Sequence, residues 1–208
     1  MSEPQRCIFA HGFEGVPQGR KARYLRENLG FSVEAPLLNQ RGFSLEDQVD
    51  VLLGALDADP DVRLVVGSSL GAFAVAVAAS RRPDRDLRLV LLAPAVGLHA
   101  VWAAQMGADG MALWAEMGRL QYYHQGVEHE VQLPYALWTQ CRDAAEVVLQ
   151  HPTVIVHGLL DDVIPAESAL ALARRSPGVR RFLGVPDGHR LLSSLPLLGE
   201  ACALVLAG

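Results

Sequence analysis

Strand-length apolar runs, separated by helical patterns, constrain the fold of this chain more than any other feature. The runs cover residues 7–10, 31–36, 62–67, 87–95, 152–158 and 179–185. They rarely alternate with polar residues, which is typical of parallel strands that are covered on both faces. Helical patterns cover residues 18–29, 45–58, 70–81, 166–176 and 191–206. This alternation predicts an α/β sandwich whose parallel strands are joined by short right-handed crossovers.

The length of 208 residues allows one sizeable core, so we expect a single domain over residues 1–208. Residues 96–150 exceed what a simple crossover requires, and they hold all three tryptophans. A small cap over the carboxyl edge of the sheet would explain both the length and the aromatic content. A longer pair of packed helices is the alternative, and periodicity alone does not separate the two.

Composition and charge exclude several classes of partner. The formal net charge of −5 argues against a broad nucleic-acid surface. Three widely spaced cysteines fit reduced thiols better than a disulfide framework. The N-terminal sequence lacks the layout of a secretory signal, and no apolar run reaches the about 18 residues of a membrane helix. We therefore expect a cytoplasmic protein with no nucleic-acid and no membrane partner.

The segment "GSSLG" at residues 67–71 places Ser69 at the centre of a G-x-S-x-G pattern. A predicted strand precedes it and a predicted helix follows, which is the context in which this pattern holds a nucleophilic serine on a strained turn. The flanking glycines remove side chains that would collide with the strand and the helix. The backbone N–H of Leu70 would then face a developing oxyanion near the helix N-terminus. The alternative is an ordinary turn, where glycine and serine are also common.

A nucleophilic serine needs a base, and the base needs an acid that orients it. His189 lies in the turn-rich "GVPDGHRLL", although a histidine there could equally be a plain surface residue. Asp161 and Asp162 follow the strand predicted over 152–158, at the edge where open α/β sheets place their chemistry. We expect one of the two aspartates to stabilise the N-terminus of the next helix instead. His157 is better suited to shaping the turn than to accepting protons.

The segment "CIFAHGFEG" at residues 7–15 ends a predicted strand in a His-Gly-Phe turn. Glycine in this turn lets the backbone approach a substrate closely. The N–H of Phe13 could be a second oxyanion donor, opposite that of Leu70. The alternative is a glycine turn that merely follows a strand.

Taken together, these residues give the chain a resemblance to the α/β-hydrolase superfamily, above all to its small serine esterases and acyl thioesterases. The segments "HGFEG", "VGSSLGAF", "LLAPA", "HGLLDDVIP" and "DGHRL" occur in the family's order over nearly the whole length. The resemblance implies Ser69 as nucleophile, Asp161 as acid and His189 as base. It also implies the backbone N–H groups of Phe13 and Leu70 as the oxyanion donors.

The same resemblance implies a three-layer sandwich with a mainly parallel sheet, helices on both faces and a short cap-like region. The strand before the His-Gly-Phe turn comes almost at the start of the sequence. The family's first two antiparallel strands are therefore expected to be absent, which leaves about six parallel strands.

The expected reaction is hydrolysis of a small-molecule carboxylic ester or thioester through an acyl-enzyme on Ser69. It needs no cofactor, and no metal-ligand spacing is visible. The alternatives are an acyl-protein or acyl-CoA thioesterase and, from another class, a non-catalytic binding protein of the same fold. Association into a homodimer is left open. Candidates for an apolar acyl pocket, although such side chains more often belong to a core, are Phe13, Trp102, Met106, Trp114, Tyr122 and Tyr123.

Overall fold

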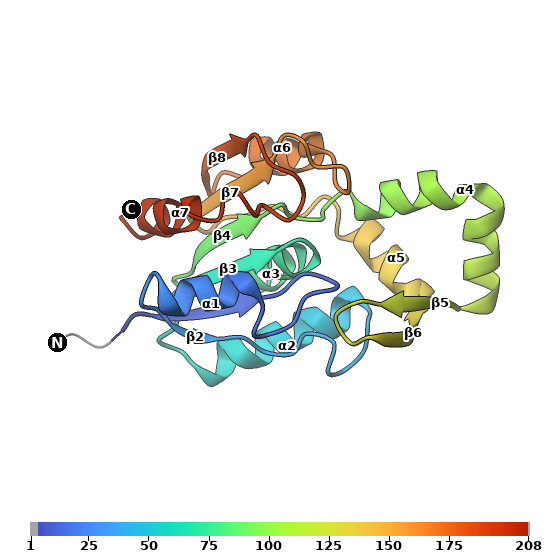
Figure 1. Ribbon diagram of the computed structural model, residues 1–208, viewed down its shortest axis with the longest axis horizontal. Coiled ribbons are helices and arrows are strands. Elements are labelled where there is room, and N and C mark those ends of the chain that lie inside the picture. The colour runs from blue at the N-terminus through green and yellow to red at the C-terminus, as the bar shows by residue number, and fades with distance from the viewer. Residues whose placement is uncertain (1–3, 208) are drawn as a thin grey trace.

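A six-stranded parallel sheet forms the centre of the molecule, in a computed structural model that describes residues 4–207 (Figure 1). In spatial order its strands are β2 (Ser32–Glu34), β1 (Arg6–Ala10), β3 (Leu64–Ser68), β4 (Arg88–Leu92), β7 (Thr153–Gly158) and β8 (Val179–Val185). Every neighbouring pair runs parallel. The six parallel strands predicted from the apolar runs are therefore confirmed.

Helices pack on both faces of this sheet. One face carries α2 (Leu45–Ala58), α3 (Leu70–Ser80) and α6 (Ala166–Arg175), and the other carries α1 (Arg20–Glu27) and α7 (Leu197–Leu206). This arrangement confirms the expected three-layer α/β sandwich. Within residues 4–207, no helix combines the length and the apolar character that crossing a membrane requires.

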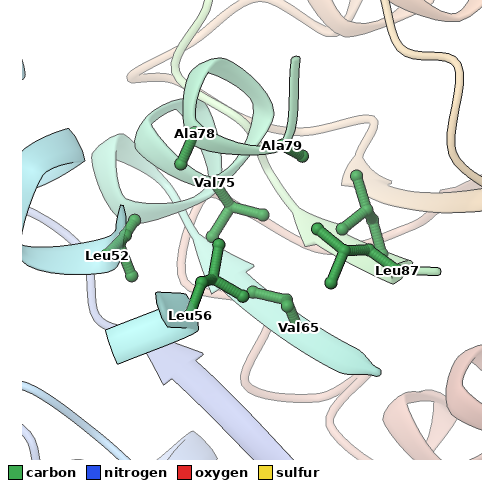
Figure 2. Close-up of a pocket in the computed structure, with 8 residues that line it drawn as sticks. Leu52, Leu56, Val65, Val75, Ala78, Ala79 and Leu87 are labelled. Atoms are coloured by element: carbon green, nitrogen blue, oxygen red, sulfur yellow. The ribbon is translucent and has the colours of Figure 1, made fainter. Parts of the chain in front are cut away.

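Alternating side chains on the central strand β3 divide the apolar interior into two cores. Val65 packs with α2 and α3, whereas Leu64 and Val66 pack with α1 and α7 on the other face. Figure 2 shows a small gap in the first core, between α2, α3 and the sheet. This gap has no room for a water molecule, so it belongs to the packed core and is no ligand site. Its lining residues are all apolar: Leu52, Leu56, Val65, Val75, Ala78, Ala79, Leu87 and Leu89.

The parallel arrangement places the carboxyl ends of all six strands at one edge of the sheet. The chain leaves β1 at residues 11–13, β3 at Ser69, β7 near Asp161 and β8 near His189. Open α/β sheets bind ligands at this edge, because the loops that follow the strands converge there. The fold thus gathers the residues that the sequence singles out.

The last helix begins later than its sequence pattern predicts. The pattern favours a helix over residues 191–206, whereas α7 begins at Leu197. Leu191 has a φ of 51°, which a right-handed helix does not accept, and Pro196 occupies the N-cap position. The apolar residues before Pro196 therefore extend the loop after β8.

Residues 98–143, here called the inserted segment, lie between β4 and β7 in the chain and project to one side of the sheet (Figure 1). They form α4 (Leu98–Met117), β5 (Arg119–His124), β6 (His129–Pro134) and α5 (Tyr135–Asp143). The helix α4 bends sharply at Gly107, whose φ of 67° and ψ of 177° are not helical. The strands β5 and β6 pair antiparallel as a separate hairpin. The sequence predicted either a small cap or a pair of packed helices, and neither expectation included this hairpin.

Candidate active site

Ser69 lies at the sharp turn where β3 becomes α3. Its φ of 55° is in the left-handed region, which a residue with a side chain adopts only when its surroundings enforce it. The backbone N–H of Ser69 donates to the carbonyl of Leu92 on the neighbouring strand at 2.8 Å. The turn thus remains tied to the sheet while the serine hydroxyl stands beyond the strand end.

Glycines on either side make this turn sterically feasible. A Cβ at Gly67 would lie 2.5 Å from the Cα of Ala72 in α3. A Cβ at Gly71 would lie closer than 3.0 Å to the carbonyl oxygens of both Ala10 and His11. The start of α3 therefore packs directly against the end of β1, with space for hydrogen atoms only.

Gly71→Ala is expected to lower the free energy of unfolding by about 3 kcal/mol or more, because the new methyl group meets backbone atoms that cannot rotate away. Gly54→Ala in α2 is the matched control, since a Cβ there meets nothing within 4 Å. It should raise the stability by about 0.5–1 kcal/mol through helix propensity. Urea unfolding of both variants measures the difference. Equal stabilities would show that α3 does not approach β1 this closely.

An unbroken hydrogen-bond chain joins Ser69, His189 and Asp161. The Oγ of Ser69 lies 2.8 Å from Nε2 of His189. The Nδ1 of the same ring lies 2.7 Å from Oδ2 of Asp161. Because the carboxylate can only accept, Nδ1 carries the hydrogen and Nε2 is free to accept the serine proton. The Asp161 side chain is fully buried and that of His189 is 14% exposed.

Asp161 is held by donors on both of its oxygens. Its Oδ1 accepts from the backbone N–H groups of Val163 and Ile164 at 2.9 and 2.8 Å. Burial alone would raise the pKa of the Asp161 carboxyl, but hydrogen bonds from His157, His189 and the Ile164 amide hold it well below its ordinary value of 3.8. The side chain is therefore a carboxylate at neutral pH. Asp162, the other candidate acid, is exposed.

Acidification is expected to remove the stability that this carboxylate contributes. Because the pKa of Asp161 is lower in the folded state, the unfolded chain binds the proton more readily. The contribution is complete above about pH 4 and is lost as the pH falls through the folded-state pKa. Urea unfolding should thus separate wild type from Asp161→Asn more at about pH 7 than at about pH 3. An equal separation at both values would contradict this linkage.

His157 was expected only to shape the turn, but it also lies next to the Asp161 carboxylate. Its Nε2 lies 3.0 Å from the carbonyl oxygen of Ile164 and 3.2 Å from Oδ2 of Asp161. Both partners are acceptors, so Nε2 carries the hydrogen and supports the acid as well as the turn. The i, i+4 spacing of His157 and Asp161 across a strand end is the signal that could have revealed this contact.

The loop that carries His189 is fixed by a residue two positions earlier. The Asp187 carboxylate accepts the backbone N–H groups of Gly188 and Ser194, each at 2.8 Å. On the far side of the histidine, Nζ of Lys21 in α1 donates to the carbonyl of Arg190 at 2.8 Å. The imidazole is therefore positioned by a closed loop that is anchored at both ends.

The His-Gly-Phe turn after β1 lies directly against the serine. The carbonyl of Gly12 accepts the backbone N–H of Gly15 at 2.9 Å, which closes a turn over residues 12–15, here called the 12–15 turn. A Cβ at Gly12 would lie 3.2 Å from the Cβ of Ser69. Phe13 thus follows the residue in contact with the serine. Leu70 opens α3, so its N–H has no acceptor within the helix.

His11 supports this turn from inside the fold. Its Nε2 accepts the backbone N–H of Leu38 at 3.1 Å, so its Nδ1 carries the hydrogen and donates to the carbonyl of Gly12 at 2.9 Å. Burial is the main cause that lowers the pKa of His11. The buried, uncharged imidazole of His11 therefore stabilises the turn through its hydrogen bond to Gly12.

Five of the six residues predicted to line an acyl pocket belong to one apolar cluster, in which Trp114 is buried with its ring centroid 5.6 Å from that of Trp102. The ring of Phe13 contacts those of Trp102 and Tyr122, with centroids 6.4 and 5.5 Å apart, and Met106 packs in the same cluster. Trp114 is 2% exposed and donates its indole N–H to the Leu133 carbonyl at 3.1 Å, which makes it core of the inserted segment.

Tyr123 does not belong to this cluster. It is 52% exposed, because successive side chains of β5 face opposite sides and Tyr122 faces the cluster. Two contacts of Phe13 were not predicted: its ring centroid lies 6.5 Å from that of Phe43 and 5.0 Å from that of His124. Within residues 4–207, no three histidine, cysteine or acidic side chains gather as a metal site would require.

Comparison with known proteins identifies the family of this chain. Residues 6–176 match the uncharacterised protein family UPF0227, a range that includes Ser69 and Asp161 and ends before His189. The chain belongs to this family. A curated relative of the UPF0227 chain is 2-hydroxymuconate semialdehyde hydrolase from Pseudomonas sp. (strain CF600), 29% identical over an alignment of 155 residues. That alignment covers 60% of this chain and 55% of the relative, so the chain spans just over half of the relative's length.

Solved structures, among them an alpha/beta hydrolase, share the fold of the UPF0227 chain. Alpha/beta hydrolase domain-containing protein 10 from mouse has a TM-score of 0.78 at 21% identity, over 97% of this chain and 89% of that one. Est1E from Butyrivibrio proteoclasticus, solved with ferulic acid bound, has a TM-score of 0.76 at 20% identity, over 100% and 92%. At these identities the likeness shows the fold, and it confirms the fold that the sequence predicts.

Proposed function

We propose that this UPF0227 member is a serine hydrolase that cleaves a carboxylic ester or thioester. The observation that carries the proposal is the hydrogen-bond chain from Asp161 through His189 to Ser69, with distances of 2.7 and 2.8 Å. Such a chain supplies what a serine hydroxyl lacks at neutral pH, namely a base already aimed at its proton and an acid that holds the base. A non-catalytic protein of this fold would not need all three residues of this hydrogen-bond chain.

The reaction proceeds in two steps. His189 accepts the Ser69 proton at Nε2 while Oγ bonds to the substrate carbonyl carbon, and the carbonyl π electrons move to its oxygen. The tetrahedral intermediate collapses, the alcohol or thiol leaves with the proton from His189, and an acyl-enzyme remains. Water then attacks the acyl carbon with His189 as base, which releases the acid and restores the hydroxyl. The Asp161 carboxylate stabilises the imidazolium that forms in each step.

The backbone N–H groups of Phe13 and Leu70 are proposed to bind the oxyanion. Two features support them: the 12–15 turn packs against Ser69, and the N–H of Leu70 has no acceptor within α3. Each donor of this kind contributes about 10²–10³ in rate.

The aromatic cluster around Phe13 and Tyr122 is proposed to receive the acyl group, and the inserted segment to act as a cap within one domain over residues 1–208. The rings of Phe13, Trp102 and Tyr122 provide apolar surface beside the 12–15 turn. The relatives fit a small organic substrate, since one is named for 2-hydroxymuconate semialdehyde and Est1E was solved with ferulic acid.

Turnover of a substrate panel tests the proposal. The panel comprises p-nitrophenyl esters of graded chain length, a p-nitrophenyl ester of an aromatic acid, acyl-CoA thioesters and 2-hydroxymuconate semialdehyde. At least one ester or thioester should be hydrolysed, and rapid mixing should show a burst of p-nitrophenol that approaches one equivalent of protein if deacylation is the slower step. No turnover of any panel member above that of the Ser69→Ala variant would refute the proposed function.

A further inference from the structure

The hairpin of the inserted segment contacts the backbone of the 12–15 turn. On β5, His124 places its Nε2 2.7 Å from the carbonyl oxygen of Phe13. At the hairpin tip, a Cβ on Gly126 would lie 2.5 Å from the carbonyl oxygen of Glu14, so the two backbones leave no room for a side chain. Residues more than a hundred positions apart in the chain are thus in direct contact beside Ser69.

The direction of the His124 hydrogen bond is fixed by its partner. A carbonyl oxygen only accepts, so Nε2 of His124 carries the hydrogen and donates it. The side chain is fully buried, and its Nδ1 has no hydrogen-bond partner among the described residues. Burying a polar ring with one unpaired nitrogen is costly. Within residues 4–207, the hydrogen bond to Phe13 is the one hydrogen bond that this ring makes, and it is directed at the turn.

A second hydrogen bond from the same face of β5 reaches the next residue of the turn. The hydroxyl of Tyr122 donates to Oε1 of Glu14 at 2.7 Å. Burial and this carboxylate raise the pKa of Tyr122 to about 12, so the hydroxyl keeps the proton that it donates. Glu14 is exposed, and the contact is accordingly the weaker of the two.

The hydrogen bond from His124 lies close to the proposed oxyanion site. Phe13 carries both the carbonyl that accepts this bond and the N–H that is proposed to bind the oxyanion. Fixing the carbonyl limits rotation about ψ of Phe13, and the bond from His11 to Gly12 limits the preceding residue. The N–H of Phe13 lies between these two carbonyl groups. Its position is therefore fixed by His11 on the side of the sheet and by His124 on the side of the inserted segment. The Phe13 ring, packed on His124 at 5.0 Å and on Tyr122 at 5.5 Å, adds to the restraint.

We propose that His124 is a positioning residue that aligns the Phe13 N–H with the developing oxyanion, with Tyr122 in a supporting role. The inserted segment then acts in the chemical step as well as in covering the site. This inference rests on the proposed function, because an oxyanion forms only in acyl transfer. It concerns the transition state, so the hydrogen bond should change kcat and leave ground-state binding largely unaffected.

His124→Phe tests this role, because it keeps an aromatic ring and removes the donor. We expect kcat for the best p-nitrophenyl ester to fall about 10–100-fold, with KM changed by less than about threefold. His124→Gln supplies an amide donor and should recover most of the lost kcat. His129→Gln is the matched control, since His129 lies on the same hairpin and is exposed. It should behave as wild type.

A trifluoromethyl ketone separates oxyanion alignment from general damage. Ser69 Oγ bonds to the ketone carbon, the carbonyl electrons become the hemiketal oxyanion, and His189 takes the serine proton. Its affinity for His124→Phe should fall by about the same factor as kcat/KM. If His124→Phe does not fold, Tyr122→Phe removes only a hydroxyl and should lower kcat and the ketone affinity together by about three- to tenfold.

The outcomes distinguish this inference from the proposed function. An active wild type whose foldable variants, His124→Phe or Tyr122→Phe, keep its kcat and ketone affinity would overturn the positioning role alone. A loss carried by KM without a loss of kcat would overturn it as well. A wild type that hydrolyses nothing in the panel would remove both proposals.

Discussion

Ser69→Ala is expected to lower ester turnover by at least about 10⁴-fold, to the level that binding and oxyanion contacts alone support. The variant deletes the oxygen that is proposed to form the acyl-enzyme, whereas the proposed base and acid, His189 and Asp161, remain in place. Ser69 is only partly buried and alanine removes a single oxygen atom, so the variant should fold as wild type does. Initial rates with the best panel substrate measure the loss.

Ser68→Ala is the control for this substitution. Ser68 is the last residue of β3 and is buried beside the turn, outside the hydrogen-bond chain that joins His189 and Asp161. Its removal should change kcat by less than about tenfold. A comparable loss in both variants would indicate that the turn, and not the Ser69 hydroxyl, is what turnover requires.

Asp161→Asn is expected to lower kcat by about 10⁴-fold, since an amide can present its N–H to the imidazole and favour the wrong tautomer. Asp162→Asn is the matched comparison, with the same chemical change one residue away on an exposed side chain. It should retain more than about a third of the wild-type rate. A larger loss in Asp162→Asn than in Asp161→Asn would reverse the assignment of the acid.

The main features of the fold were predictable because they depend on short-range patterns. Each continuous apolar run became a strand of the parallel sheet, although the edge strands β2 and β8 are only partly buried. The helix predicted over 45–58 has the same bounds in the structure. That helix carries its own start signal, a capping box between Ser44 and Asp47. The order of the motifs along the chain placed Ser69, Asp161 and His189 at the same sheet edge.

The features that were missed depend on contacts between distant segments. The start of α7 was misplaced because Leu191, Leu192 and Leu195 fit a helical pattern, while the loop after β8 needs them in another conformation. The β5–β6 hairpin escaped notice, although Leu120, Tyr122 and His124 alternate with exposed residues as a half-buried strand does.

Supporting residues were harder to find than the residues they support. No spacing rule links His124 to Phe13, because the fold alone brings their segments together. Asp187 likewise resembles an ordinary turn residue in "PDG", and its role is visible only once its carboxylate is seen to close the loop around His189. Tyr123 and Tyr122 were both predicted to line the acyl pocket, but neighbouring side chains of β5 face opposite sides, so only Tyr122 joins the cluster.

Covalent labelling by a fluorophosphonate, followed by intact-mass measurement and peptide mapping, tests most directly whether Ser69 is activated by His189 and Asp161. We predict one phosphonyl group per chain, located on Ser69, with labelling abolished in Ser69→Ala and slowed by more than about 10²-fold in His189→Ala. A folded wild-type protein that remains unlabelled, or one labelled equally fast without His189, would contradict the account.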